Sequence, residues 1–318
     1  MRIERWAIDS ELAREAEENY RTAFTKRLAD YSGVEVMRQL TFDGVVPRIT
    51  PEQVEALLSW ISTTILPHPL RGVGVEVGSG PLVFSSILAR SPGISLMYGV
   101  EVCAPLVDEL APIVARDLLG ADSDKLVGVV GSFDAMALAD SSVDFVFDFY
   151  SLHHALDVKK TFQEIGRVLK PGGILLMLDK ARPDEYTDAD LDALLDQEYS
   201  ESYKVQFGIP VHEKLTRRMN GEREYRLSDW RKAMYAGGME MIRFYNLQQT
   251  TGGSLPVRLY KRIMSWLPLS IQVAITRHVA HAAKRHAFAL DTKERIFSSH
   301  ANAFRKEMSV LVGEKRTP

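Results

Sequence analysis

The stretch Arg71-Gly-Val-Gly-Val-Glu-Val-Gly-Ser-Gly-Pro-Leu82 decides the fold of this 318-residue chain. Its alternating valines indicate a short buried strand, and the glycines that follow, Gly78 and Gly80, allow a tight turn. Pro81 suits the first position of a helix that we expect to reach Arg90. A strand, a glycine turn and a helix start together form an anion-binding device, because the free N–H groups of the helix point into the turn.

A second strand follows at the distance that nucleotide-binding folds require. It places Glu101 at its carboxyl end, about 20 residues beyond the turn. A carboxylate there can accept hydrogen bonds from both hydroxyls of a ribose. The dinucleotide fingerprint needs a third glycine where this chain has Val83, so the sequence argues against NAD.

Composition excludes several classes of protein. With 46% apolar residues the chain can bury a large core, and its net charge of −3 gives no general attraction to nucleic acid. The single cysteine, Cys103, excludes internal disulfides and a cysteine-built zinc site, and it suits a reducing cytoplasm. The longest apolar stretch, 263–275, is short and contains Pro268, so no segment is expected to span a bilayer. We therefore expect a cytoplasmic protein without a metal site.

Strands and helices alternate from Val73 onward, which predicts a doubly wound parallel α/β sheet. Strands are expected near 73–77, 95–100, 125–130, 144–149 and 174–179, separated by helices near 81–90, 104–119 and 157–169. The ligand should lie outside the carboxyl ends of these strands.

Two further motifs lie in this region. Gly131–His154 is G-S-F-D-A-M-A-L-A-D-S-S-V-D-F-V-F-D-F-Y-S-L-H-H, and Glu164–Gly173 is E-I-G-R-V-L-K-P-G-G. With the E-x-G-x-G turn, they resemble the class I S-adenosylmethionine-dependent methyltransferases of the ubiquinone/menaquinone type, a type 11-like family. The resemblance covers roughly residues 73–180. It implies a Rossmann-like seven-stranded sheet with an antiparallel last strand, and S-adenosyl-L-methionine as the cofactor.

The resemblance also assigns cofactor roles. The turn would bind the methionine end of the cofactor, and Glu101 would bind its ribose. This chain departs from the family at two positions: Leu82 replaces the usual glycine, and Ser132 replaces the aspartate that binds adenine. Phe133 would offer its backbone N–H and a ring, and a carboxylate with two aromatic rings would favour the sulfonium cation. The full set expected at the cofactor is Glu76, Gly78, Ser79, Gly80, Glu101, Val102, Ser132, Phe133, Asp148, Phe149 and Tyr150. Each also has an ordinary structural alternative, such as a plain turn or a core ring.

His153 and His154 follow the fourth strand and are the candidate general bases. An imidazole with a pKa of about 6.5 can take a hydroxyl proton near neutral pH. Alternation along the chain favours His154, and the alternative is that the pair only packs the loop. The next candidates would be Tyr150, Asp179 and His212.

Beyond the fifth strand the chain departs from the smallest members of the family. An acidic, mainly helical segment, 184–201, is typical of a solvated face. A sixth strand is expected at 239–247 and the seventh at 306–315, and between them lie helices near 255–267, 269–289 and from Thr292 to about 304. The predicted organisation is an N-terminal helical cap (1–70), a core (71–247) with a cap segment (180–227), a helical insertion (248–305) and the last strand (306–318).

The insertion is basic. From Gln248 to Lys306 there are ten Lys or Arg residues and two carboxylates, a local charge of +8. Three interpretations stay open: packing that neutralises the acidic segment, recognition of an anionic acceptor, and docking of 255–289 on an anionic membrane through Trp266 and Leu267. No recognised nucleic-acid module accompanies the charge, so nucleic acid is not an expected partner.

These observations predict methyl transfer to a small-molecule acceptor. The histidine pair favours O-methylation of a secondary metabolite, a lipid or quinone precursor, or a sugar, with C- or N-methylation as alternatives. A dehydrogenase and a non-catalytic cofactor-binding scaffold remain further alternatives. Val83 and the 131–173 motifs oppose the first, and the intact turn with Glu101 opposes the second.

Overall fold

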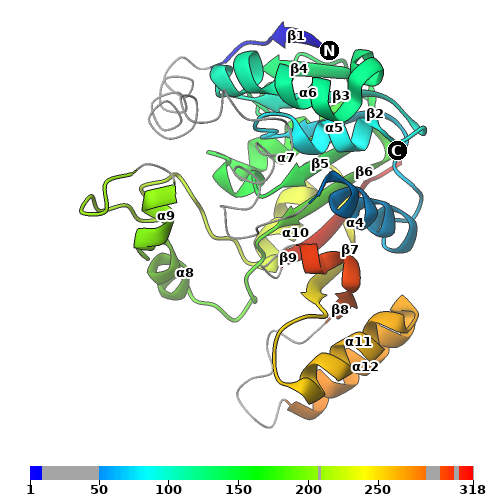
Figure 1. Ribbon diagram of the computed structural model, residues 1–318, viewed down its shortest axis with the longest axis vertical. Helices are drawn as coiled ribbons and strands as arrows, with labels where there is room; N and C mark the ends of the chain where they lie inside the picture. Colours follow the sequence, from blue (N-terminus) through cyan, green and yellow to red (C-terminus); the bar gives the residue numbers. More distant parts are fainter. Residues whose placement is uncertain (9–49, 207–208, 284–293, 304–307, 318) are drawn as a thin grey trace.

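The protein is built on one nine-stranded sheet (Figure 1). The computed structural model describes all residues except 9–49, 207–208, 284–293, 304–307 and 318. The strand order is β1-β4-β3-β2-β5-β6-β9-β7-β8, and every neighbouring pair is parallel except the two that involve β9. The Rossmann-like class with an antiparallel last strand is therefore confirmed.

The sheet has two strands more than the seven predicted. The strands are β1 (Arg2–Arg5), β2 (Gly72–Val77), β3 (Ile94–Glu101), β4 (Leu126–Val130), β5 (Val143–Phe149), β6 (Leu169–Asp179), β7 (Met239–Gln249), β8 (Arg295–Ser298) and β9 (Met308–Lys315). The additional strands, β1 and β8, have four residues each and lie at the two edges. Four residues are too few to show a clear hydrophobic period, so these strands were not predicted.

Helices cover both faces of the sheet. Their bounds are α4 (Pro51–Thr64), α5 (Val83–Ala89), α6 (Ala111–Leu119), α7 (Val158–Val168), α8 (Asp188–Leu195), α9 (Glu201–Gln206), α10 (Leu227–Ala236), α11 (Leu255–Trp266) and α12 (Leu269–Ala283). One core cluster joins α4, α5 and α6 to one face, with Leu57, Phe84 and Val114 buried in it. The other joins α7 and α10 to the opposite face through Phe162 and Trp230.

Two helix predictions need correction, and one lies outside the described residues. Helix α5 begins at Val83 and not at Pro81, because Leu82 has a left-handed backbone with φ 62° and forms the N-cap. The predicted helix from Thr292 to about 304 is wrong: β8 and a 3-10 helix occupy Arg295–Ala303. Backbone pairing with β7 and burial of Ile296 outweigh local helix propensity there. Most of the predicted N-terminal helical cap, residues 9–49, lies outside the described residues.

The helices α11 and α12, joined by Leu267 and Pro268, project from the sheet beyond its β8 edge (Figure 1). Both contact β8. Among the described residues, none of the helices combines the length and apolarity that a bilayer crossing requires.

Candidate cofactor and acceptor site

The turn between β2 and α5 is shaped by two glycines with different surroundings. Gly78 and Gly80 both have positive φ, 62° and 52°. A Cβ on Gly78 would lie 2.4 Å from Cβ of Ser151, whereas a Cβ on Gly80 would meet nothing within 4 Å. Gly78 therefore permits close packing of two loops, and Gly80 leaves open space where a ligand can approach the backbone.

Glu101 connects the turn to the end of β3. Its Oε2 accepts the N–H of Gly80 at 2.9 Å, and its Oε1 accepts the N–H of Cys103 at 2.9 Å. The residue is 8% exposed, and burial raises the pKa of its carboxyl group. Each oxygen keeps a second lone pair for a hydroxyl group. Glu101 thus has the position and the acceptor capacity that a ribose requires, and Val102 lies half-buried beside it.

Glu76 has a different role from Glu101. Its Oε2 accepts the backbone N–H of Ser85 at 2.7 Å and also the Ser85 hydroxyl. Burial raises the pKa of Glu76 to about 8. Its described partners are in the first turn of α5, so Glu76 fixes the helix against β2.

Two buried polar atoms near the turn lack partners. Within the described part of the chain, neither Ser79 Oγ nor Asp148 Oδ2 has a hydrogen bond. Asp148 lies beside Val77 in the register of β2 and β5, and its Oδ1 accepts the N–H groups of Ser151 and Leu152. Burial and the nearby Asp179 carboxylate raise the pKa of Asp148. Buried polar atoms in proteins normally have a hydrogen-bond partner, which can be a ligand or water. Ser79 Oγ and Asp148 Oδ2 could therefore bind the polar methionine end of S-adenosylmethionine.

The two aromatic residues at the end of β5 are arranged differently. The Phe149 ring packs on Phe84, with 4.3 Å between ring centroids, which agrees with a core role. Tyr150 has φ 53°, a conformation that costs a non-glycine residue of order 1–3 kcal/mol and that clusters at functional sites. Tyr150 is therefore the stronger candidate for a contact at the sulfonium.

At the adenine end, Ser132 Oγ accepts the N–H of Asp134 at 3.1 Å and so closes its own turn. Phe133 is half-buried in the core cluster on the α7 side. The sequence did not indicate Trp6, which β1 places against Gly131: a Cβ on this glycine would lie 3.1 Å from Cβ of Trp6. A tryptophan after a four-residue strand carries no distinctive signal, so only sheet pairing could reveal it.

The structure couples His153 to a carboxylate. His153 is buried in a 3-10 turn, and its Nδ1 lies 2.8 Å from Oδ1 of Asp179 at the end of β6. Its backbone N–H donates to the other Asp179 oxygen at 3.1 Å. Burial acts to raise the pKa of Asp179, but the His153 imidazole lowers it on balance. When Nδ1–H donates to Asp179, Nε2 is the basic nitrogen that remains.

His154, which sequence alternation favoured, is arranged differently. The residue is exposed, its ring lies 4.3 Å from that of His153, and no described carboxylate contacts its imidazole. Crowding by the surrounding chain and the neighbouring His153 lower the pKa of His154. His212, the other candidate, is exposed in the cap. The geometry thus favours His153.

Ion pairs attach the cap segment 180–227 next to His153. Lys180 Nζ pairs with Glu222 and lies 3.5 Å from Glu224, and Tyr199 donates to Glu222. Burial opposes ionisation, but Lys180 lowers the pKa of Glu222 to about 2. Arg223 N–H donates to the His153 carbonyl at 3.0 Å. The cap is therefore in position to bound the acceptor side of the site.

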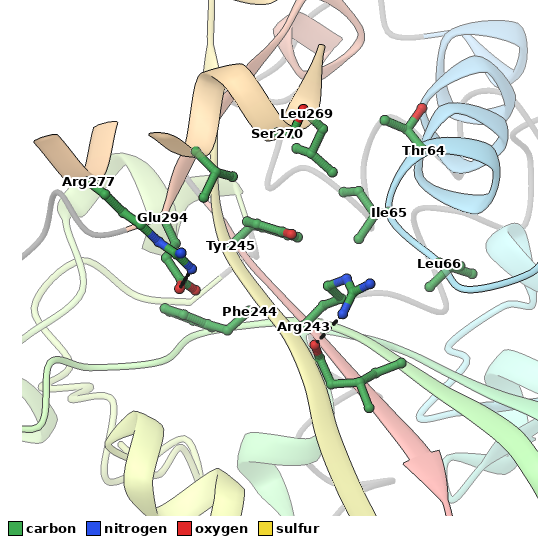
Figure 2. A pocket seen from close by; sticks show the side chains of 12 residues that line it. Thr64, Ile65, Leu66, Arg243, Phe244, Tyr245, Leu269, Ser270, Arg277 and Glu294 are labelled. Atoms are coloured by element: carbon green, nitrogen blue, oxygen red, sulfur yellow. Dashed lines mark hydrogen bonds and ion pairs between the residues drawn. The ribbon is translucent and has the colours of Figure 1, made fainter. Parts of the chain in front are cut away.

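A cavity of about 530 Å³ lies elsewhere, between the end of α4, β7 and the start of α12. In Figure 2, the Tyr245 hydroxyl points toward Ile65, and Arg277 pairs with Glu294 at 2.6 Å. β7 is three strand positions from β5, so this cavity is separate from the turn and Glu101. No cluster of three or more metal-ligating side chains occurs among the residues that the structure describes.

Comparison with known proteins agrees with this geometry. Residues 75–177 match a family model described as a methyltransferase domain. The chain is 28% identical over 134 residues to sterol 24-C-methyltransferase ERG6B of Gibberella zeae. This match covers 42% of this chain and 31% of that protein. It is 25% identical over 214 residues to the uncharacterized methyltransferase YcgJ of Bacillus subtilis, covering 66% and 71%. The chain spans less than half the length of the first relatives it matches.

The fold is similar to that of a solved structure of geranyl diphosphate methyltransferase in complex with GPP and sinefungin, with a TM-score of 0.51 and 11% identity. The match covers 97% of this chain and 100% of that one. At this identity the likeness shows the fold alone. Residues 75–177, which match the methyltransferase-domain model, include both the glycine turn and Glu101.

Proposed function

We propose that this protein transfers the methyl group of S-adenosylmethionine to a small molecule that loses a proton in the reaction. The single observation that supports this most is the buried His153–Asp179 pair, 2.8 Å apart, at the carboxyl ends of β5 and β6. The loop that carries His153 contacts the turn, since Ser151 Oγ donates to the Gly78 carbonyl at 2.9 Å, and β2 separates β5 from the strand that ends in Glu101. A base oriented by a carboxylate suits proton removal from an acceptor.

Each group has a separate role in this proposal. When bound, S-adenosylmethionine supplies an electrophilic methyl carbon. Ser79, Gly80 and Glu101 bind and orient its methionine and ribose, and Tyr150 lies at the sulfonium end. His153 Nε2 takes the acceptor proton, while Asp179 fixes the imidazole and stabilises its positive charge. The cap contributes to the rate in two further ways: it aligns the acceptor with the methyl carbon and it excludes water.

The acceptor atom is proposed to be a hydroxyl oxygen. A hydroxyl needs a base near neutral pH, whereas a neutral amine does not. Carbon is the second candidate, because the sterol relative is named a C-methyltransferase and His153 can equally take a proton from carbon. Transfer of a deuterated methyl group, followed by NMR of the product, distinguishes an O-methyl from a C-methyl carbon.

Calorimetry with S-adenosylmethionine tests the cofactor assignment. Glu101→Ala removes charge-assisted hydrogen bonds worth roughly 1.5–3 kcal/mol each, so affinity should fall at least about tenfold. Glu109→Ala, an exposed carboxylate after the same strand, is the matched control and should bind like wild type. Equal affinities of wild type and Glu101→Ala, or tight NAD binding by wild type, would contradict the proposal.

A further inference from the structure

Exposed large apolar side chains concentrate on the two projecting helices. Of the 14 such residues in the described part of the chain, eight lie on α11 and α12. They are Leu255, Val257, Leu259, Tyr260, Ile263, Trp266, Ile271 and Val279. Contiguous exposed apolar surface on a soluble protein marks an interaction site.

Helix α11 arranges part of this set as a stripe. Leu255, Leu259, Ile263 and Trp266 follow one another at intervals of four, four and three residues, so they share one helix face. Leu255 and Trp266 are each 72% exposed. Met264, on the opposite face, is the one buried residue of this helix. The helix therefore contacts the protein through one face and presents an apolar stripe on the other.

Helix α12 faces the fold with both apolar and polar side chains, because Leu269 and Val273 pack against the core. Its buried side includes Gln272 and Thr276. The Gln272 side chain accepts the backbone N–H of Phe297 at 2.8 Å and donates to its carbonyl, which caps the edge strand β8. Ile271 and Val279 face outward, 45% and 47% exposed. Ile271 and Val279 therefore add to the exposed apolar area of the two projecting helices.

The charge of the same region indicates the chemistry of that partner. Residues 248–283 contain Arg258, Lys261, Arg262 and Arg277, and no Asp or Glu. Only Arg277 has a carboxylate partner among the described residues. The guanidinium of Arg262 lies 5.7 Å from the centre of the Trp266 ring, at the edge of the stripe.

The acidic segment 184–201 does not neutralise these cations in the described part of the chain. Asp192 and Asp196 pair with Arg218, and Asp188 pairs with Arg226, all within the cap or its border. A second copy of the chain would bring a like-charged face to the same surface. An anionic surface with an apolar interior fits both the cations and the stripe.

We propose that α11 and α12 dock the protein on the surface of a bilayer that contains anionic phospholipid. The stripe of Leu255, Leu259, Ile263 and Trp266 lies in the interface, and Arg258 and Arg262 contact the lipid phosphates. Tryptophan prefers this boundary, because its ring is apolar and its N–H is polar. The helices lie on the membrane and do not cross it. This inference does not depend on the proposed reaction.

Co-sedimentation with vesicles tests the proposal. Wild type should bind vesicles of mixed phosphatidylcholine and phosphatidylglycerol, and should bind pure phosphatidylcholine weakly. Leu259→Glu places a charge in the stripe and should lower binding at least about tenfold. Val205→Glu is the matched control, because Val205 is 59% exposed and Leu259 58%. Combined Arg258→Gln and Arg262→Gln should lower binding to mixed vesicles roughly 25-fold, about fivefold per cation.

Trp266 supplies an independent readout. Its fluorescence should be quenched by lipids brominated in the acyl chain, and Trp266→Phe should remove most of that quenching. Circular dichroism melts of each variant confirm that it is folded. Equal binding by wild type and Leu259→Glu, or binding indifferent to phosphatidylglycerol, would overturn the proposal. So would failure to bind vesicles together with a dimer that Leu259→Glu dissociates, which would assign the stripe to a second copy.

Discussion

The two sides of the candidate site are built in different ways. On the cofactor side, the turn at Gly78–Gly80 and Glu101 are linked by hydrogen bonds from backbone N–H groups to a buried carboxylate. On the acceptor side, His153, Asp179 and the cap are linked through side chains that come from distant parts of the chain. The cofactor side depends on backbone conformation, and the acceptor side depends on which strand ends lie together.

This difference implies that the two sides can be damaged separately. A change in a backbone turn should affect folding and cofactor affinity, because the turn belongs to the core between β2 and α5. A change in the His153–Asp179 pair should affect the chemical step, because the pair lies at the carboxyl ends of β5 and β6 and is the proposed base. Variants on each side can therefore test whether cofactor binding and the chemical step depend on different residues.

The largest expected effect is on the acceptor side. His153→Ala and Asp179→Asn should each lower kcat by about 10² to 10⁴, because the first removes the base and the second removes its orienting partner. Cofactor affinity by calorimetry should stay at the wild-type value.

His154→Ala is the matched control for this prediction, since His154 is adjacent in the chain and has no described carboxylate partner. It should keep near-normal kcat. If instead His154→Ala lowers kcat by this amount and His153→Ala keeps near-normal kcat, then His154 is the base, as sequence alternation predicted.

The cofactor side should show its own dependence on pH through Glu76. Its folded pKa of about 8 exceeds the ordinary value of 4.5, so the folded state keeps a proton that the unfolded state loses. The stabilisation is complete below pH 4.5 and is lost as pH rises through 8. Relative to Glu76→Gln, wild type should lose about 2–3 kcal/mol of unfolding free energy between pH 5 and 7.

Urea unfolding of both proteins at several pH values measures this difference, and effects of other ionisable groups cancel in the comparison. Because the amide oxygen that Glu76→Gln introduces can still accept from Ser85, the variant should fold at both ends of the range. A constant difference between the two proteins across this range would mean that Glu76 ionises normally.

The smallest effect should be that of Gly80→Ala, one of a matched glycine pair with Gly78→Ala. Gly80→Ala should cost about 1 kcal/mol of unfolding free energy, the cost of positive φ, and should lower cofactor affinity by filling open space. Gly78→Ala should cost about 1–3 kcal/mol more, because its Cβ would clash with Ser151. Thermal melts and calorimetry separate the two outcomes. Equal destabilisation with equal affinity would show that the open space at Gly80 is not the cofactor site.

The central part of the fold was predictable because its signals are local. The strands from β2 to β6 follow from apolar runs of ordinary length, and the turn follows from two glycines that both adopt positive φ. The antiparallel pairing of the last strand, β9, agrees with the family resemblance. Edge strands β1 and β8 were missed because a four-residue strand depends on its neighbour for backbone hydrogen bonds.

The sequence by itself determined the turn and its link to Glu101 at the candidate site, since a glycine turn, a strand and a following carboxylate lie in one short stretch and their requirements are those of the backbone. The tertiary structure alone decided that His153 pairs with Asp179. These residues follow β5 and end β6, and parallel pairing of Phe149 with Leu178 brings them together. It also decided that α11 exposes its apolar stripe and that Ile271 and Val279 of α12 face outward. Local spacing specifies a helix face, but only packing against β8 determines which face meets the protein.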